Sequence, residues 1–115
     1  MKESEIQARI RLALGEEHDV TLWRNNVGVA EMWSSAGKSQ RVQYGLCVGS
    51  SDLIGMLAPK GRLIALEVKK PGEKPTPDQV KFQAHVRAMG GFAAVVCSPD
   101  EARAAIARAR QGASE

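Results

Sequence analysis

The chain has 115 residues, of which 43% are hydrophobic and 25% are charged, and its formal net charge is +3 at pH 7. This length fits one domain, residues 1–115, with a modest core, and the composition excludes a disordered or fibrous protein. No stretch approaches the length of a membrane span and the N-terminus has no apolar signal segment, so we expect a cytoplasmic protein without a membrane partner.

The first residues predict an amphipathic helix over 3–14. At 100° per residue, Ile6, Ile10 and Leu14 fall on one face, which is the face that a helix buries against a core. Glu3 falls in the middle of the same apolar face. A carboxylate at that position requires a partner, or else it is a helix-start glutamate favoured by the helix dipole.

Three strand candidates follow, together with one segment that is harder to place. Residues 20–24 predict a strand, and residues 29–43 are either two short strands joined by a turn or a mobile loop. Residues 52–58 and 62–69 predict a hairpin, because Pro59-Lys60-Gly61 between them is a turn signal. The most hydrophobic strand of the chain is therefore expected to be antiparallel to the strand before it.

The C-terminal third predicts a helix, a strand and a second helix. Thr76 caps the first of these helices, and Gln79 completes a T-x-x-Q capping box. An apolar strand follows over 92–97, and a second capping box at Ser98 opens the last helix. The expected fold is α/β, in the order α-β-β-β-α-β with a C-terminal helix, and the connecting helix makes the sheet a mixed one.

Glu67 and Lys69 interrupt the apolar strand 62–69. Side chains alternate across a strand, so these two groups share one face. They form either a simple ion pair or part of a chemical centre. An exposed pair contributes only about 0–1 kcal/mol, which is a weak reason to place a carboxylate in a core strand.

Asp52 favours the chemical centre, provided that the hairpin has the right register. A loop of either two or four residues places Asp52 opposite either Glu67 or Lys69, whereas a strict three-residue loop places it opposite Val68 unless a bulge intervenes. Two carboxylates on adjacent strands suit Mg²⁺ or Mn²⁺, and the backbone carbonyl of Val68 is a further candidate ligand. Lys69 would then orient or deprotonate a water, or balance the charge of a phosphate.

Other residues with known chemistry offer no comparable centre. Cys47 and Cys97 lie in no CxxC or Cys/His cluster, and Cys97 is expected to be a small core residue. No signal for an organic cofactor is present. Three methionines are expected in the core: Met32, Met56 and Met89.

These residues lie in strings that resemble the virus-type replication–repair nuclease (VRR-NUC) domain of the PD-(D/E)xK nuclease superfamily. The hallmarks are G-x-x-D-L ending at Leu53, then "EVKKP", then "TPDQ", then a Gly-Gly turn into an apolar strand. "ESEIQARI" and "LWRNNVG" resemble the opening of that family. Residues 29–43 are the least matched part, and Asp52 follows a serine where proline is usual, a difference that removes no ligand.

The resemblance implies a restriction-endonuclease-like mixed sheet flanked by helices, and a role for each matching residue. Asp52 and Glu67 would hold the divalent metal, Lys69 would be the catalytic lysine, and Glu3 would reach the metal directly or through water. Gln79 would lie near the active centre, although its role in the capping box is an alternative that does not exclude this one.

Contacts to DNA are expected from two groups of residues. Arg24, Asn25 and Asn26 would line the DNA path, although an Asn-Asn pair also makes turns. Basic residues are concentrated around strand 62–69, where a solvated face is the simpler interpretation. Three of them would contact phosphates: Lys70, Lys74 and Lys81.

The function expected from the resemblance is metal-dependent cleavage of DNA. Small stand-alone members of this family are viral and can act as homodimers on branched DNA such as four-way junctions, so we expect cleavage of branched DNA by a homodimer, in the cytoplasm of a bacterial or virus-infected host cell. Two alternatives remain open. One is a nuclease or nickase acting on flap, duplex or single-stranded DNA, and the other is a non-catalytic DNA-binding subunit on a nuclease fold.

Overall fold

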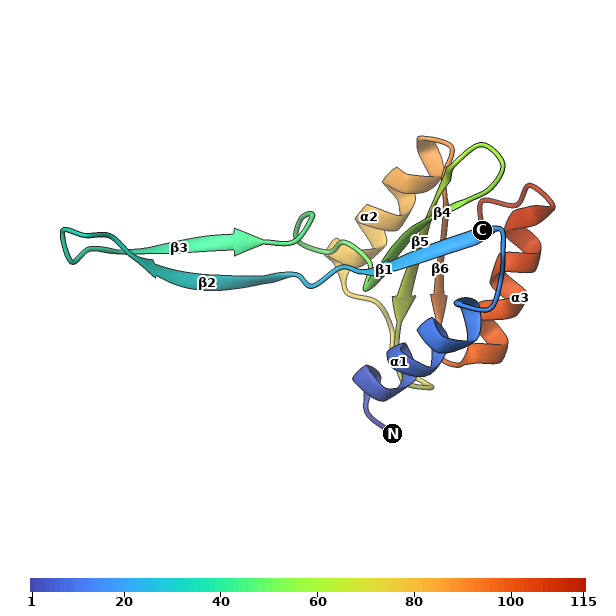
Figure 1. The fold of residues 1–115 in the computed structure, drawn as a ribbon, viewed down its shortest axis with the longest axis horizontal. Coiled ribbons are helices and arrows are strands. Elements are labelled where there is room, and N and C mark those ends of the chain that lie inside the picture. The colour runs from blue at the N-terminus through green and yellow to red at the C-terminus, as the bar shows by residue number, and fades with distance from the viewer.

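The computed structural model describes all residues from 1 to 115, and its element order confirms the expected mixed α/β fold (Figure 1). The elements are α1 (Glu3–Leu14), β1 (Val20–Arg24), β2 (Gly28–Trp33), β3 (Ser39–Tyr44), β4 (Leu53–Leu57), β5 (Arg62–Val68), α2 (Pro77–Ala88), β6 (Phe92–Val96) and α3 (Pro99–Arg110). None of the helices is long and apolar enough to cross a membrane.

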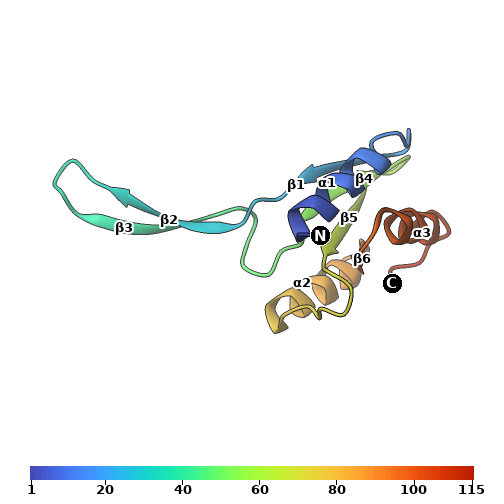
Figure 2. The same cartoon turned by 90° about the horizontal axis from the view of Figure 1, so that it is seen from below.

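Four of the strands form one sheet in the order β1-β4-β5-β6. β4 is antiparallel to its neighbours β1 and β5, and β6 runs parallel to β5 because α2 makes the crossover between them. Figure 2 shows α2 on the other side of the sheet from α1. The sheet therefore lies between two helical layers, one formed by α1 and α3 and the other by α2.

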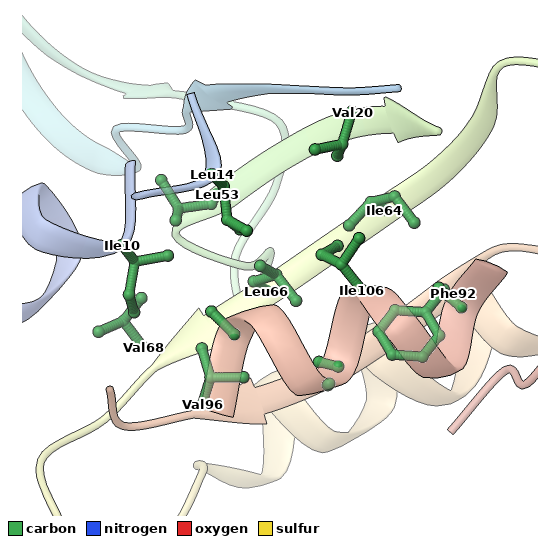
Figure 3. Close-up of a cluster of buried hydrophobic side chains, with 14 of the residues drawn as sticks. Ile10, Leu14, Val20, Leu53, Ile64, Leu66, Val68, Phe92, Val96 and Ile106 are labelled. Carbon is green, nitrogen blue, oxygen red and sulfur yellow. The ribbon is translucent and has the colours of Figure 1, made fainter. Parts of the chain in front are cut away.

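The main core lies between the sheet and the layer of α1 and α3. Figure 3 shows Ile10 and Leu14 of α1 and Ile106 of α3 directed toward the side chains of the central strands. Leu66 and Val68 of β5 are fully buried in this cluster. The alternate residues of β5 therefore face α2, where the apolar cluster is small and includes Ala65. Glu67 lies on this second face.

The turn between β4 and β5 sets the position of the carboxylates. Leu57 pairs with Arg62, so the connection has four residues, and Leu53 pairs with Leu66 at the other end of the hairpin. Extending that register by one residue places Asp52 opposite Glu67. The structure thus has one of the two registers that the metal hypothesis required.

Residues 29–43 form a hairpin and not a loop. Strands β2 and β3 pair only with each other, and a turn with Gly37 at φ 78° joins them. In both views this hairpin projects from the end of β1, away from the sheet and the helices (Figures 1 and 2). We call residues 28–44 the arm. Its projection makes the molecule elongated, with dimensions of 54, 33 and 27 Å.

Four side chains that were expected in the core lie elsewhere. Met32 is exposed because it lies on the arm, Met56 points outward from β4, and Met89 ends α2, where it is 76% exposed. The Cys97 thiol is half-buried and contacts the carboxylate of Glu101. That contact also explains why only half of the second capping box forms: Ser98 accepts from the Glu101 N–H, while the Glu101 side chain is bonded to Cys97.

Candidate active site

Glu67 lies near the end of β5, an inner strand of the sheet, with only 2% of its surface exposed. Its strand is flanked by β4 and β6, so neighbouring backbone excludes water from both sides. One carboxylate oxygen, Oε1, lies 3.6 Å from the Lys69 ammonium, while the other, Oε2, is buried without a hydrogen-bond partner. A buried oxygen without a partner is costly in a protein interior and indicates a missing partner.

Asp52 lies at the end of the loop that leads into β4. Its Oδ2 accepts a hydrogen bond of 2.8 Å from the backbone N–H of Val68, which fixes the carboxylate against the end of β5. The N–H and C=O of one strand residue point to the same side of the strand, so the Val68 carbonyl is directed toward the Asp52 side as well. The predicted ligand group Asp52, Glu67 and Val68 therefore converges at one end of the sheet.

The pKa of Glu67 depends on its burial and on the charges of Asp52 and Lys69. Burial raises the pKa of Glu67 to about 8, and the nearby charge of Asp52 acts in the same direction. The Lys69 charge lowers the pKa of Glu67 but does not offset the other effects. Without an additional positive charge, the two carboxylates are not both ionised near neutral pH.

A divalent cation fits this set of donors. Mg²⁺ and Mn²⁺ prefer carboxylate and carbonyl oxygens, and the Oε2 atom of Glu67 lacks the partner that such an ion would be. No three His, Cys, Asp or Glu side chains gather closely enough to ligate one ion by themselves. The geometry thus supports Asp52 and Glu67 as the protein carboxylates, with backbone and water completing the coordination.

Glu3 lies near this centre, as the helical periodicity predicted. It is half-buried at the start of α1, whereas Glu5 is exposed. Burial and a hydrogen bond to Glu73 raise the pKa of Glu3, and the charges of Asp52 and Lys69 also act on it. This placement suits contact with a metal through water, and a direct bond from Glu3 stays a prediction.

Gln79 borders the site but is occupied by its helix cap. Its Oε1 accepts the Thr76 N–H at 2.8 Å, and the Thr76 hydroxyl accepts the Gln79 N–H in return. Gln83 and Val86 are the buried residues of α2, whereas Gln79 at the start of the helix is only half-buried. Its half-buried side chain still lines a pocket of about 260 Å³ together with Asp52.

The residues expected along the DNA path fall into two classes. Arg24, Asn25 and Asn26 all line the same pocket as Asp52. The side-chain amide of Asn25, however, is bonded to the chain itself, through Ser50, Ser51 and Leu46. The three lysines expected at phosphates are all exposed: Lys70, Lys74 and Lys81.

Comparison with known proteins identifies the family. The VRR-NUC domain model matches residues 1–110. The chain belongs to the VRR-NUC family. A phage protein, "Putative nuclease p44" of Acyrthosiphon pisum secondary endosymbiont phage 1, is 35% identical over 85 residues, which are 74% of this chain and 81% of that protein. A solved structure named "VRR_NUC domain" superimposes with a TM-score of 0.56 and 25% identity over 91% of this chain and 94% of that one.

Membership in the VRR-NUC family makes the chain a nuclease with DNA as its substrate class. It also confirms the resemblance that the sequence strings indicated and the restriction-endonuclease-like fold. Two features of this VRR-NUC site did not emerge from the sequence. The first is the hydrogen bond between Glu73 and Glu3, because Glu73 lies in a loop rich in Lys and Pro that shows no periodicity. The second is the set of hydrogen bonds that the Asn25 side chain makes within the protein, because its partners lie 21–26 residues further along the chain.

The raised pKa of Glu67 predicts that the metal-free protein loses stability as pH rises. The folded protein holds the proton of Glu67 up to about pH 8, whereas the unfolded chain holds it only up to about pH 4.5. The stability that the folded state gains from this tighter proton binding is therefore fully present below pH 4.5 and is lost as the pH rises from 4.5 to 8. We expect Glu67→Gln to raise the free energy of unfolding by about 1–4 kcal/mol at pH 8 and by little at pH 5. Urea unfolding in EDTA at both pH values measures this, and a less stable variant at pH 8 would contradict it.

Glu3 and Glu5 offer a matched pair on one helix for testing contact with the metal. Mn²⁺ that binds only the folded state stabilises it by about 2.7 kcal/mol at 100 times its dissociation constant. We expect Glu3→Gln to reduce the Mn²⁺-induced rise in Tm, because Glu3 lies near Asp52 and Lys69. Glu5→Gln should leave that rise unchanged, because Glu5 is exposed on α1. Equal effects of the two substitutions would remove Glu3 from the site.

Proposed function

We propose that this VRR-NUC chain is a divalent-metal-dependent DNA endonuclease whose catalytic residues are Asp52, Glu67 and Lys69. The observation that carries the proposal is the opposition of Asp52 and Glu67 across the β4–β5 hairpin, with one buried Glu67 oxygen left without a partner. A core strand gains no stability from such a pair. A site that binds a hard cation accounts for both carboxylates and for the lysine beside them.

Each residue would contribute a distinct step to phosphodiester hydrolysis. A bound Mg²⁺ or Mn²⁺ would polarise a phosphate oxygen and lower the pKa of a coordinated water. Asp52 and Glu67 would hold the ion, and Lys69, only 9% exposed, would place its ammonium beside the reacting phosphate. That fixed positive charge stabilises the negative charge that develops as water attacks phosphorus and the sugar oxygen leaves.

The surroundings of the site favour contacts to the DNA backbone. Arg24 and Asn26 are exposed at the pocket that Asp52 and Gln79 line, and Asn26 makes no side-chain hydrogen bond within the chain. Lys70, Lys74 and Lys81 would extend this surface, and replacing any one lysine that binds a phosphate should lower the salt dependence of DNA binding by about 0.9 in log–log slope. Binding through the backbone selects DNA by shape more than by sequence.

Lys69 provides the sharpest test of catalysis. We expect Lys69→Ala to lower cleavage with Mn²⁺ by at least about 100-fold, because the substitution removes a buried positive charge next to the phosphate. Binding of Mn²⁺, measured by calorimetry, should persist because both carboxylates remain. Lys60→Ala, in the exposed turn at the far end of the β4–β5 hairpin, is the control and should cleave normally.

The choice of DNA distinguishes this proposal from its two rivals. Four-way junctions, flaps, plain duplex and single strands should be compared with and without Mn²⁺, and we expect four-way junctions to be cleaved fastest. Faster cleavage of flaps, duplex or single strands would indicate the first rival activity. No cleavage of any form, with intact DNA binding, would indicate a non-catalytic DNA-binding subunit.

Branched DNA fits this chain if it acts as a homodimer, and the arm is the surface that we propose for pairing. Five of the fourteen large hydrophobic side chains that the molecule exposes lie on the arm, and three of these five share one face. The register of β2 and β3 places Ala30, Met32, Val42 and Tyr44 on one face of the arm. A two-stranded hairpin with an uncovered apolar face is only marginally stable by itself, so this face requires a partner.

A second copy of the chain is the occupant that the charges favour. The charged residues of the arm are Lys38, Arg41 and Glu31, so its net charge is only +1. This charge is low for a surface that binds DNA. Two identical arms related by a two-fold axis would cover each other's apolar faces. The resulting homodimer would present two active sites to the two strands that a junction resolvase must cut.

The arm proposal predicts a change of oligomeric state. Met32→Lys combined with Val42→Lys places two charges on the apolar face, and we expect sedimentation to show a dimer for the wild type and a monomer for this variant. The control, Ser39→Lys combined with Gln43→Lys, adds the same charge to the opposite face and should remain dimeric. A wild-type monomer at micromolar concentration would contradict the arm as a dimer interface.

A further inference from the structure

We propose that Asn25 is a positioning residue that holds the Asp52 carboxylate in place and does not contact DNA. This inference rests on the proposed function and deepens it, because it concerns how one of the two metal carboxylates is held. It also replaces the role that the sequence suggested for Asn25. The three observations that carry it are the hydrogen bonds of the Asn25 side chain, those of its backbone, and the tight loop to which both are bonded.

The side-chain amide of Asn25 is fully engaged with the residues before Asp52. Its Nδ2 donates to the Ser50 hydroxyl at 2.7 Å and to the Ser51 carbonyl at 2.9 Å. Its Oδ1 accepts the backbone N–H of Leu46 at 3.3 Å. Both amide protons and the oxygen therefore have partners inside the chain, so binding a phosphate or a base would break one of these bonds.

The backbone of Asn25 adds a fourth bond, to Asp52 itself. The Asn25 N–H donates to the Asp52 carbonyl at 2.8 Å, just beyond the paired residues of β1 and β4. Asn25 thus holds the main chain at Asp52 and, through its side chain, the two residues before it. The Asp52 carboxylate is then directed to the Val68 N–H, so its position depends on where this main chain lies.

The loop between Leu46 and Asp52 has little freedom to absorb a displacement. Ser50 closes a turn in which its N–H and its hydroxyl both donate to the Cys47 carbonyl, at 3.1 and 2.7 Å. Gly49 adopts φ 83°, and a Cβ at this position would lie 2.5 Å from the backbone carbonyl of Asp78 at the start of α2. A shift at Asn25 would therefore move Asp52 rather than be taken up by the loop.

Only asparagine suits this position among residues of similar shape. Aspartate has no donor for Ser50 and Ser51, and alanine has neither donor nor acceptor. Asn26 provides the contrast, because it is exposed and makes no side-chain hydrogen bond within the chain. The Leu46 bond also closes the base of the arm, so the same amide joins the arm to the loop that carries Asp52.

The test compares metal binding with DNA binding. For Asn25→Ala we expect the dissociation constant for Mn²⁺, measured by calorimetry without DNA, to rise roughly 10–100-fold, as is typical when a residue that orients a metal ligand is removed. Affinity for a four-way junction in EDTA should stay within about two-fold of the wild type. The opposite pattern, unchanged Mn²⁺ affinity with weakened DNA binding, would show that Asn25 is a DNA contact and overturn the proposal.

Two further variants separate positioning from general loss of stability. Ser98→Ala removes the N-cap bond of α3, away from the site, and should lower stability by about 1 kcal/mol without changing Mn²⁺ affinity. An equal loss of Mn²⁺ affinity in Ser98→Ala and Asn25→Ala would overturn the proposal. Should Asn25→Ala not fold, Ser50→Ala removes one acceptor of the Asn25 amide, and we then expect a few-fold weaker Mn²⁺ binding with unchanged affinity for the junction.

Hydrogen exchange in EDTA tests the positioning independently of the metal. The Leu46 amide, which donates to Asn25, should exchange at least about ten-fold faster in Asn25→Ala than in the wild type. Unchanged exchange would overturn the role of Asn25 even if the chain is an active nuclease. Failure of the wild type to bind Mn²⁺ or to cleave DNA would instead overturn the proposed function, while the exchange result would still decide whether Asn25 holds the loop.

Discussion

The placement of two carboxylates at the same end of a buried hairpin is the constraint around which this molecule is organised. Burial raises the pKa of Glu67 to about 8, with Asp52 opposite acting in the same direction. The Lys69 ammonium, 3.6 Å from Glu67, compensates only in part. The centre is therefore poised for a divalent cation, which would satisfy the remaining oxygen and keep both carboxylates ionised.

The rest of the fold positions these groups, and the apolar core on the other face of the sheet offsets the stability cost of burying them. The main core lies on the α1–α3 side of the sheet, where Leu66 and Val68 are completely buried (Figure 3). The alternate face toward α2 is packed with small side chains such as Ala65, which leaves room for Glu67 and Lys69. One strand thus anchors the fold with one set of side chains and supports chemistry with the other.

The loop before β4 and the arm extend this organisation outward. Asn25 is bonded both to the loop that ends at Asp52 and to Leu46, where the chain returns from the arm. An apolar arm that pairs two copies would then be joined directly to the elements that form each active site. If two copies pair through the arm as proposed, the partner molecule and the two carboxylates of each site would lie within a short span of chain, as the proposed cleavage of both strands of a branched substrate requires.

The sequence alone determined most of the local elements, because helix periodicity, capping boxes and turn residues act over a few positions, and its resemblance to the VRR-NUC domain indicated the candidate site residues. Glu3 on the buried face of α1 and the Thr76–Gln79 box are examples. Only the tertiary structure decided the register that sets Asp52 opposite Glu67, the projection of residues 28–44 as an arm, and the internal bonding of Asn25. Each of these features depends on which distant segments of the chain come into contact. Hydrogen bonds between residues 21–26 positions apart produce no repeating pattern in the sequence that could predict them.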